Sequence, residues 1–221
     1  MKKTLIISGR TGGLGTVITK YFTAKGYNVV EDPVFHHKLQ DFDSVKIAIE
    51  KAVAEYGSID ACIHCAVSPI IRKDVINFEP EEFRSQFEVG FFGGFNLFKV
   101  IAPIMQKQKF GSIIGITTTA IEEPSPNMGA YIVSKIALRG LLRELARELK
   151  PSGVRVNAIA PGLMITKLNS DLSDKAMQIM QEKYPDEITN PKDVAEIAYS
   201  ICSQKSQTSK SFSVLGEPID L

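Results

Sequence analysis

The 221-residue chain lacks several features that would mark a specialised class of protein. It has only three cysteines, which are too few for a disulfide framework and suit a reducing compartment. Its 26 basic and 25 acidic residues leave a formal net charge of +1, so no overall field favours nucleic acid or anionic lipid. No apolar run approaches the roughly 20 residues of a membrane helix, and the segment before Ser8 is too short for the apolar core of a signal peptide. These absences predict a cytoplasmic protein with neither nucleic-acid nor membrane partners.

The hydrophobic residues, 44% of the chain, suffice for one core and follow two alternating patterns. Short β-branched runs predict strands at Thr4–Ile7, Val29–Val30, Ile59–His64, Ser112–Ile116, Val154–Ile159 and Phe212–Leu215. Longer segments of helical period predict helices at Gly15–Lys25, Ser44–Tyr56, Pro80–Gln108, Tyr131–Leu149 and Pro191–Cys202. Pro103 should kink the third helix or end its regular part. Without repeats or a dividing linker, residues 1–221 should form a single α/β domain, a Rossmann-like doubly wound parallel sheet with helices on both faces.

The segment between Val30 and Ser44 breaks this alternation. It holds only thirteen residues, includes Pro33 and shows no helical period. A crossover between parallel strands needs at least about 10–12 residues including its helix, so a further strand near Val34–Leu39 could not be reached by a full helix. We therefore expect the sheet edge after the second strand to be shortened or irregular.

A glycine-rich turn, Ser8-Gly9-Arg10-Thr11-Gly12-Gly13-Leu14-Gly15, follows the first predicted strand and opens a helix. Such a turn lets the backbone approach a pyrophosphate and aims the helix N-terminal amides at its negative charge. The alternative is a tight strand–helix turn that binds nothing. The position directly after the first strand favours nucleotide binding.

Tyr131 and Lys135 stand four residues apart on a predicted helix, so the phenol and the ammonium can point into the same cleft. A phenol has a pKa of about 10, and its pKa must fall by about 3 for half of it to ionise near pH 7, which takes roughly 4 kcal/mol. A neighbouring lysine and an oxidised nicotinamide supply a field of that kind. The alternative for the pair alone is an exposed helix face.

Further elements extend this pattern across the chain. Thr118 ends an apolar strand thirteen residues before Tyr131, and after the helix come Arg155-Val156-Asn157 and Pro161-Gly162-x-x-x-Thr166. Together with the glycine-rich turn and the Tyr131/Lys135 pair, this arrangement resembles the short-chain dehydrogenase/reductase family over essentially the whole chain.

The resemblance implies a catalytic group of four residues. Tyr131 would exchange a proton with the substrate oxygen, and Lys135 would lower the pKa of that phenol and hydrogen-bond the nicotinamide ribose. Thr118 would orient the substrate oxygen in the place where the family usually has serine. Gly90 aligns with a catalytic asparagine, at a helix kink whose main-chain carbonyl holds a relay water. The implied reaction moves a hydride between nicotinamide and a small-molecule carbonyl or secondary alcohol.

The resemblance also implies a cofactor site, NAD or NADP. Its residues would be Gly9, Arg10, Gly13, Leu14, Gly15, Asp32, Ala66, Tyr131, Lys135, Pro161, Gly162 and Thr166. An acidic side chain after the second strand binds the adenosine ribose hydroxyls and repels a 2′-phosphate, and Glu31 and Asp32 lie near that place. Although Arg10 could reach a phosphate, no further basic residue follows until Lys38, so the balance favours NAD.

Two departures from the family pattern motivate an alternative. His64-Cys65-Ala66-Val67 stands where the family has Asn-Asn-Ala-Gly, and Gly90 replaces the asparagine. A protein of this fold that binds a dinucleotide as a sensor or partner, without turnover, is therefore the second hypothesis.

Other candidate features carry weaker expectations. Cys62, His64 and Cys65 have only Cys202 as a further cysteine, which predicts no metal site. Ile165–Tyr184 could be a lid over an apolar substrate or a surface helix. The family resemblance implies a homodimer or homotetramer through the long helix and the Tyr131 helix. A cluster at helical spacing should form core or a subunit interface: Phe87, Phe91, Phe92, Phe95 and Phe98.

Overall fold

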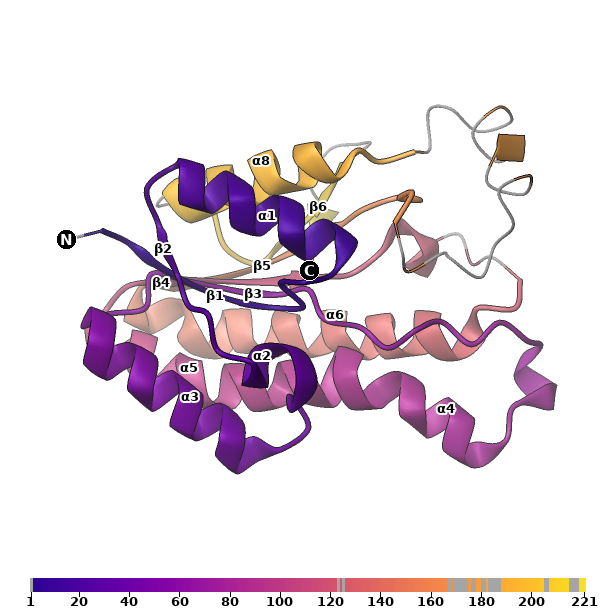
Figure 1. The fold of residues 1–221 in the computed structure, drawn as a ribbon, viewed down its shortest axis with the longest axis horizontal. Coiled ribbons are helices and arrows are strands. Elements are labelled where there is room, and N and C mark those ends of the chain that lie inside the picture. The colour runs from indigo at the N-terminus through magenta and orange to yellow at the C-terminus, as the bar shows by residue number, and fades with distance from the viewer. Residues whose placement is uncertain are drawn as a thin grey trace.

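The computed structural model describes residues 2–122, 124, 126–166, 168, 175, 178–179, 182, 188–204, 207–214 and 219–221. In this part of the chain, strands form one sheet in the order β2-β1-β3-β4-β5-β6-β7 (Figure 1). The strands are β1 Thr4–Ser8, β2 Asn28–Val29, β3 Ala61–His64, β4 Gly111–Ile116, β5 Val154–Ala160, β6 Lys210–Ser213 and β7 Ile219–Asp220. Neighbours from β2 to β6 pair in parallel, whereas β7 pairs antiparallel with β6. The predicted Rossmann-like fold is confirmed, and β7 is an addition to it.

Helices cover both faces of this sheet (Figure 1). They are α1 Gly13–Ala24, α2 Val34–His37, α3 Phe42–Tyr56, α4 Pro80–Phe87, α5 Gly93–Gln108, α6 Gly129–Leu149 and α8 Pro191–Ser203. The alternation of strand β1 explains the two cores, because successive side chains point to opposite faces. Ile6 packs in the core beneath α3, α5 and α6, whereas Leu5 and Ile7 pack in the core beneath α1 and α8. All three are fully buried, as expected of a central strand.

The sheet edge after β2 is shortened, as the sequence predicts. One helical turn, α2, stands between β2 and α3, and β2 is the edge strand of the described sheet. Phe35 and Leu39 are buried in the core that also contains α3. This segment is too short for a strand and a helix, and it contributes two buried apolar side chains to the core instead.

The long helical stretch Pro80–Gln108 has its irregularity at a place other than Pro103. It consists of α4, a π-helical turn at Glu88–Phe92 (the π-turn) and α5, and Pro103 lies inside α5 without ending it. By length and composition alone the stretch could cross a membrane, since one window of 18 residues within it has a mean hydropathy of 1.3, which corrects the expectation that no such run exists. Leu97, Phe98 and Ile101 pack in the core, which is the behaviour of a core helix.

Candidate active site

The carboxyl ends of four parallel strands bring the predicted site residues to one edge of the sheet. Ser8 of β1 pairs with His64 of β3, which pairs with Gly115 of β4, and Ile116 of β4 pairs with Ile159 of β5. The segments that follow these strands are the glycine-rich turn, His64–Val67, Thr117–Thr119 and Pro161–Gly162. In open α/β sheets, ligands bind in the crevice outside these ends.

The glycine-rich turn fits a dinucleotide. Gly9 has a φ of +72°, and a Cβ there would lie 2.8 Å from the Cα of Ala66. A Cβ on Gly15 would lie 2.0 Å from the carbonyl oxygen of Gly9. Helix α1 begins after Gly12, and its N-cap makes no side-chain hydrogen bond to the first amides. Those N–H groups can therefore bind an anion such as a pyrophosphate. The short distances around Gly9 and Gly15 show that only glycine permits the close packing of the turn.

Three further predicted residues lie around this turn. Thr166 lies beside Gly13, because a Cβ on Gly13 would be 2.8 Å from the Cβ of Thr166. Ala66 is buried and packs beneath Gly9. The Leu14 side chain is buried in the core with Ile18, so only the backbone of Leu14 can contact a nucleotide.

Tyr131 lies in the first turns of α6 with a buried phenol. Its side chain is 7% exposed, and burial raises the pKa of the phenol to about 12. The Thr118 hydroxyl, which interacts with the phenol, and the nearby Arg72 act to lower that pKa, but burial outweighs them. Tyr131 is therefore protonated at neutral pH. Its pKa is raised in this structure, whereas the resemblance implies that Lys135 lowers it.

Lys135 lies one turn further along α6 and is buried with Tyr131. Its Nζ donates to the carbonyl oxygen of Ile116 at 2.7 Å and lies 5.8 Å from the centroid of the Tyr131 ring. Burial lowers the pKa of Lys135 to about 8. The ammonium thus lies between the end of β4 and the Tyr131 ring, away from solvent.

Gly90 lies in the π-turn, and its carbonyl oxygen already has a protein donor. His64 is fully buried, and its Nε2 lies 2.9 Å from the carbonyl oxygen of Gly90. The other ring nitrogen, Nδ1, lies 2.8 Å from the Ser8 hydroxyl. A Cβ on Gly90 would make only ordinary contacts, 3.8 Å from Ser134 Oγ and 3.9 Å from Val67 Cγ2, so space alone does not require glycine there.

Charged groups gather where the adenosine end of a dinucleotide would lie. Arg10 donates from Nε to His36 Nε2 at 3.3 Å and from a terminal nitrogen to Glu31 Oε1 at 3.3 Å. The Asp32 carboxylate accepts the backbone N–H of Val34 at 2.9 Å, at the start of α2. Glu31 is thus the carboxylate that faces the turn. The sequence did not predict that His36 would contact Arg10. Only its position in the shortened edge segment could have indicated this contact.

Pro161 and Gly162 are fixed at the end of β5. The Pro161 carbonyl accepts the backbone N–H of Thr119 at 3.0 Å, and the N–H of Gly162 donates to Thr189 Oγ1 at 2.9 Å. Thr189 is 1% exposed and was missed in the sequence because no spacing relates it to Gly162. These bonds hold the loop that the resemblance assigns to the nicotinamide.

Part of the surroundings of Tyr131 is apolar. Tyr131 forms a small cluster with Ile70 and Ile132, and the partly buried Val67, Ala120, Met128 and Leu168 pack against it. Leu168 belongs to the predicted lid Ile165–Tyr184, most of which lies outside the described residues. An apolar wall next to the phenol suits a substrate whose carbonyl adjoins an apolar group.

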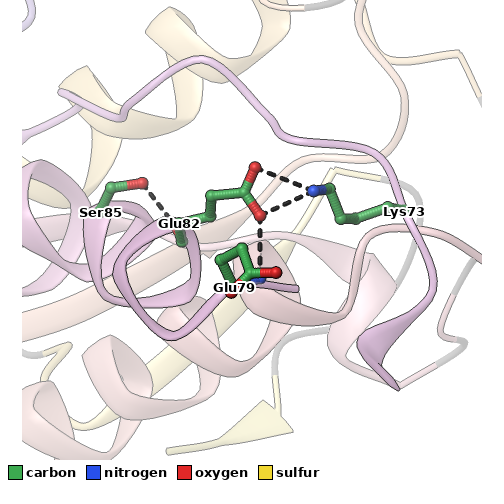
Figure 2. Close-up of polar contacts among 4 residues, drawn as sticks. All are labelled: Lys73, Glu79, Glu82 and Ser85. Carbon is green, nitrogen blue, oxygen red and sulfur yellow. Dashed lines mark hydrogen bonds and ion pairs between the residues drawn. The ribbon is translucent and has the colours of Figure 1, made fainter. Parts of the chain in front are cut away.

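Lys73 forms an ion pair with Glu82 of α4 (Figure 2). Its Nζ lies 2.9 and 2.7 Å from the two carboxylate oxygens of Glu82, which also accepts the N–H of Glu79 in a capping box at the start of α4. The backbone N–H of Lys73 donates to the Asn127 carbonyl at 3.1 Å, just before α6. The start of α4 and the approach to Tyr131 are therefore tied through one lysine.

The remaining candidates lie outside this crevice or form no site. Within the described residues, no three His, Cys, Asp or Glu side chains gather as a metal site. The predicted aromatic cluster divides, since Phe98 is buried in the core whereas Phe92 and Phe95 are 46% and 40% exposed. Core and surface roles therefore coexist in one helical stretch.

Comparisons with known proteins place the chain in a family. Residues 23–211 match the family model described as enoyl-(acyl carrier protein) reductase. The chain is 26% identical to the 3-oxoacyl-(acyl-carrier-protein) reductase FabG of Thermotoga maritima, over 92% of each chain.

Solved structures share the fold. A 3-ketoacyl-(acyl-carrier-protein) reductase from Brucella melitensis, complexed with NADH, superposes with a TM-score of 0.86 at 23% identity over 96% of each chain. ElxO with NADP bound gives a TM-score of 0.84 at 22% identity over 97% of each chain. The family model matches most of the chain, and the glycine-rich turn lies at the same sheet edge as Thr118, Tyr131 and Lys135. The chain therefore belongs to the short-chain dehydrogenase/reductase family of NAD(P)-dependent oxidoreductases.

Proposed function

We propose that the protein reduces a small-molecule carbonyl to a secondary alcohol, with Tyr131 as the proton donor. The observation that carries this proposal is the buried phenol of Tyr131 beside the Thr118 hydroxyl, with the Lys135 ammonium one turn away. A phenol whose pKa is raised to about 12 holds its proton at neutral pH, as an acid that protonates the reduced oxygen must. The bound dinucleotide supplies the hydride.

Each residue of the group has a separate task in this reaction. Thr118 orients the carbonyl oxygen toward the phenol, and Tyr131 donates its proton to that oxygen. Lys135 stabilises the phenolate that remains, because an ammonium close to an anion in a buried site interacts strongly with it. Pro161, Gly162 and Thr166 hold the nicotinamide end, while Gly9, Gly13 and Gly15 leave room for the pyrophosphate.

Replacement of Tyr131 by phenylalanine tests the reaction. Because Tyr131→Phe removes the proton donor and leaves the ring, we expect kcat to fall by about 10²–10⁴-fold while the Kd for the reduced nucleotide stays within about twofold. Turnover is followed by nicotinamide absorbance on a carbonyl panel, and binding by nicotinamide fluorescence. Tyr56→Phe, at the end of α3 that precedes β3, is the matched control.

A 3-oxoacyl thioester heads the substrate panel. Relatives named as 3-oxoacyl-(acyl-carrier-protein) reductases and the apolar wall beside Tyr131 both favour a carbonyl with an apolar neighbour. If the wild type binds a nucleotide and no carbonyl on the panel is reduced, a dinucleotide-binding sensor becomes the better description. If it binds neither NADH nor NADPH, the proposed function is wrong.

We infer that NAD is the favoured cofactor, through Glu31. Arg10 is the basic residue nearest the adenosine end, and its guanidinium is already paired with Glu31 at 3.3 Å. Asp32, whose carboxylate caps the start of α2, adds a further negative charge to the same segment, so a 2′-phosphate would be repelled there. The NADH and NADPH affinities of the wild type, measured by fluorescence titration, should therefore differ in favour of NADH.

Glu31→Gln tests this cofactor preference. The variant releases Arg10 and removes one negative charge, so we expect the affinity for NADPH to rise by about 5–10-fold, equivalent to about 1 kcal/mol or slightly more. The affinity for NADH should change less than threefold. An unchanged ratio of the two affinities would assign the preference to other residues. Glu50→Gln on α3 serves as the charge-matched control.

We further propose that residues 1–221 act as a single NAD(P)-binding domain in the cytoplasm. The match of the family model to residues 23–211 and the one continuous sheet support this extent. The near-neutral charge supports a free small molecule as substrate rather than a nucleic acid.

A further inference from the structure

His64 stands where the resemblance leads to an asparagine, and its contacts are fully determined by its neighbours. The Ser8 hydroxyl accepts the backbone N–H groups of Cys65 at 3.2 Å and Ala66 at 3.3 Å. A hydroxyl has two lone pairs and one proton, so its proton is left for His64 Nδ1 at 2.8 Å. Nδ1 is thus an acceptor, which places the ring proton on Nε2.

That assignment agrees with the partner at the other end of the ring. A carbonyl oxygen can only accept, and Nε2–H donates to the Gly90 carbonyl at 2.9 Å. Both ring nitrogens and the serine proton are therefore satisfied with a neutral imidazole. Burial and the positive charge of Lys135 lower the pKa of His64 to about 3, so the ring is neutral near pH 7.

The surroundings leave space for this ring and for little else. Gly94 of α5 faces it, and a Cβ there would lie 2.9 Å from Cδ2 and 3.0 Å from Nε2 of His64. The Phe98 ring packs edge-on against the imidazole, with centroids 5.9 Å apart. His64 therefore has one orientation, which is held from both sides.

The two ends of the ring contact different functional elements. Ser8 directly precedes Gly9, and its hydroxyl fixes the Cys65–Ala66 backbone on which the nucleotide turn packs. Gly90 belongs to the π-turn, and a side chain added there would contact Ser134 of the Tyr131 helix. A π-turn interrupts regular helical hydrogen bonding and is often found at functional sites.

We propose that His64 is a positioning residue that couples the nucleotide-binding turn to the π-turn beside the Tyr131 helix, through Ser8 at one end of its ring and the Gly90 carbonyl at the other. The inference rests on the proposed function for its kinetic readout. It differs from a proton relay, since Nε2–H donates to a backbone carbonyl, which does not take up the proton.

Two near-isosteric variants separate the two ends. His64→Asn places an amide oxygen near the position of Nδ1 and cannot reach Gly90, whereas His64→Gln places an amide nitrogen near the position of Nε2 and leaves Ser8 without its acceptor. We expect His64→Asn to keep the Kd for NADH within about threefold and to lower kcat by about tenfold. His64→Gln should raise that Kd by about tenfold and keep kcat, at saturating NADH, within about threefold.

Two further measurements separate this role from a merely structural one. Hydrogen exchange of the amides in Glu88–Phe92 should accelerate in His64→Asn and not in His64→Gln, whatever the turnover. His64→Phe keeps an aromatic ring but loses the hydrogen bonds to Ser8 and to the Gly90 carbonyl, so it should weaken NADH binding and also lower kcat. Melting temperatures, measured for every variant, set the assay temperature below unfolding.

The outcomes are exclusive. If His64→Asn and His64→Gln both lose NADH affinity and turnover in parallel, or if they lower only the melting temperature, then His64 merely stabilises the fold. In that case it does not couple the nucleotide-binding turn to the π-turn. If the wild type binds no nucleotide, the proposed function fails, and the exchange pattern alone then supports or overturns the link to the π-turn.

Discussion

A buried lysine in a site has an energetic cost that can be measured. Lys135 is 2% exposed, and burial lowers its pKa from the ordinary 10.5 to about 8. Between these two values the unfolded chain binds more protons than the folded chain, so stability rises with pH in that window. Below pH 8 both states are protonated, and the folded state carries the whole penalty, roughly 3 kcal/mol.

Lys135→Met should therefore stabilise the fold while it impairs the site. The variant avoids the cost of burying the ammonium. It also loses the hydrogen bond to the Ile116 carbonyl, and this loss reduces the gain in stability by about 1 kcal/mol. We expect a net gain of about 2 kcal/mol in the free energy of unfolding at pH 7, shrinking toward pH 10. Urea denaturation of both proteins at the two pH values provides the measurement. A variant less stable than the wild type at pH 7 would contradict this account.

The shortened edge shows how a brief element can support a site. Helix α2 has four residues, and its Phe35 contributes in two ways. The ring is fully buried in the core with α3, and the Phe35 carbonyl accepts the N–H of Gly9 at 3.0 Å. One residue thus anchors the edge segment and orients the first glycine of the nucleotide turn.

Phe35→Ala should affect stability and nucleotide binding together. Loss of a fully buried phenylalanine costs about 3–5 kcal/mol through the cavity that it leaves. Because α2 would then hold Gly9 less firmly, we expect NADH affinity to fall as well, by about 3–10-fold. Urea unfolding and fluorescence titration test the two effects. His37→Ala, an exposed change on the same turn, should stay within about 0.5 kcal/mol, and an equal loss there would overturn the explanation.

The elements that could be predicted from sequence are those whose signal is local. Helix α6 and the turn at Gly9 were found because the spacing of their residues is itself the signal. Pro103 was expected to kink the long helix or end its regular part, but the interruption lies at the π-turn around Gly90, where the family resemblance implies a helix kink. The two-residue strand β7 and the four-residue helix α2 are too short to show any period.

Contacts between distant segments could not be predicted. His64 appeared in the sequence as a departure from a family motif, and its partners Ser8 and Gly90 lie 56 and 26 residues away. Asp32 was the acidic residue assigned to the cofactor site from the sequence, with Glu31 beside it, whereas in the structure Asp32 caps the start of α2 and Glu31 pairs with Arg10. Such assignments need the tertiary fold, because each depends on which segment lies opposite.

At the scale of the whole molecule, the outer surface of α5 and α6 is where we expect two copies of the chain to associate. A groove of about 280 Å³ lies between these helices, lined by Phe95, Leu141 and Leu145 among others. Phe95 is 40% exposed, and Val133 and Ile136 of α6 are 43% and 48% exposed. Apolar side chains that are unusually exposed on neighbouring helices are typical of a subunit interface.

Phe95→Glu should therefore change the oligomeric state. We expect the wild type to elute as a dimer or tetramer in size-exclusion chromatography with light scattering, because burial of this groove against a second copy removes apolar surface from water. A carboxylate in the groove would lose its hydration against the second copy, a cost that pairing with Lys99 would not fully offset, so the variant should dissociate to a lower mass at micromolar concentration. Ile47→Glu on α3, at a side chain 52% exposed and outside the groove, is the control. A monomeric wild type, or equal dissociation in both variants, would show that this face is not the interface.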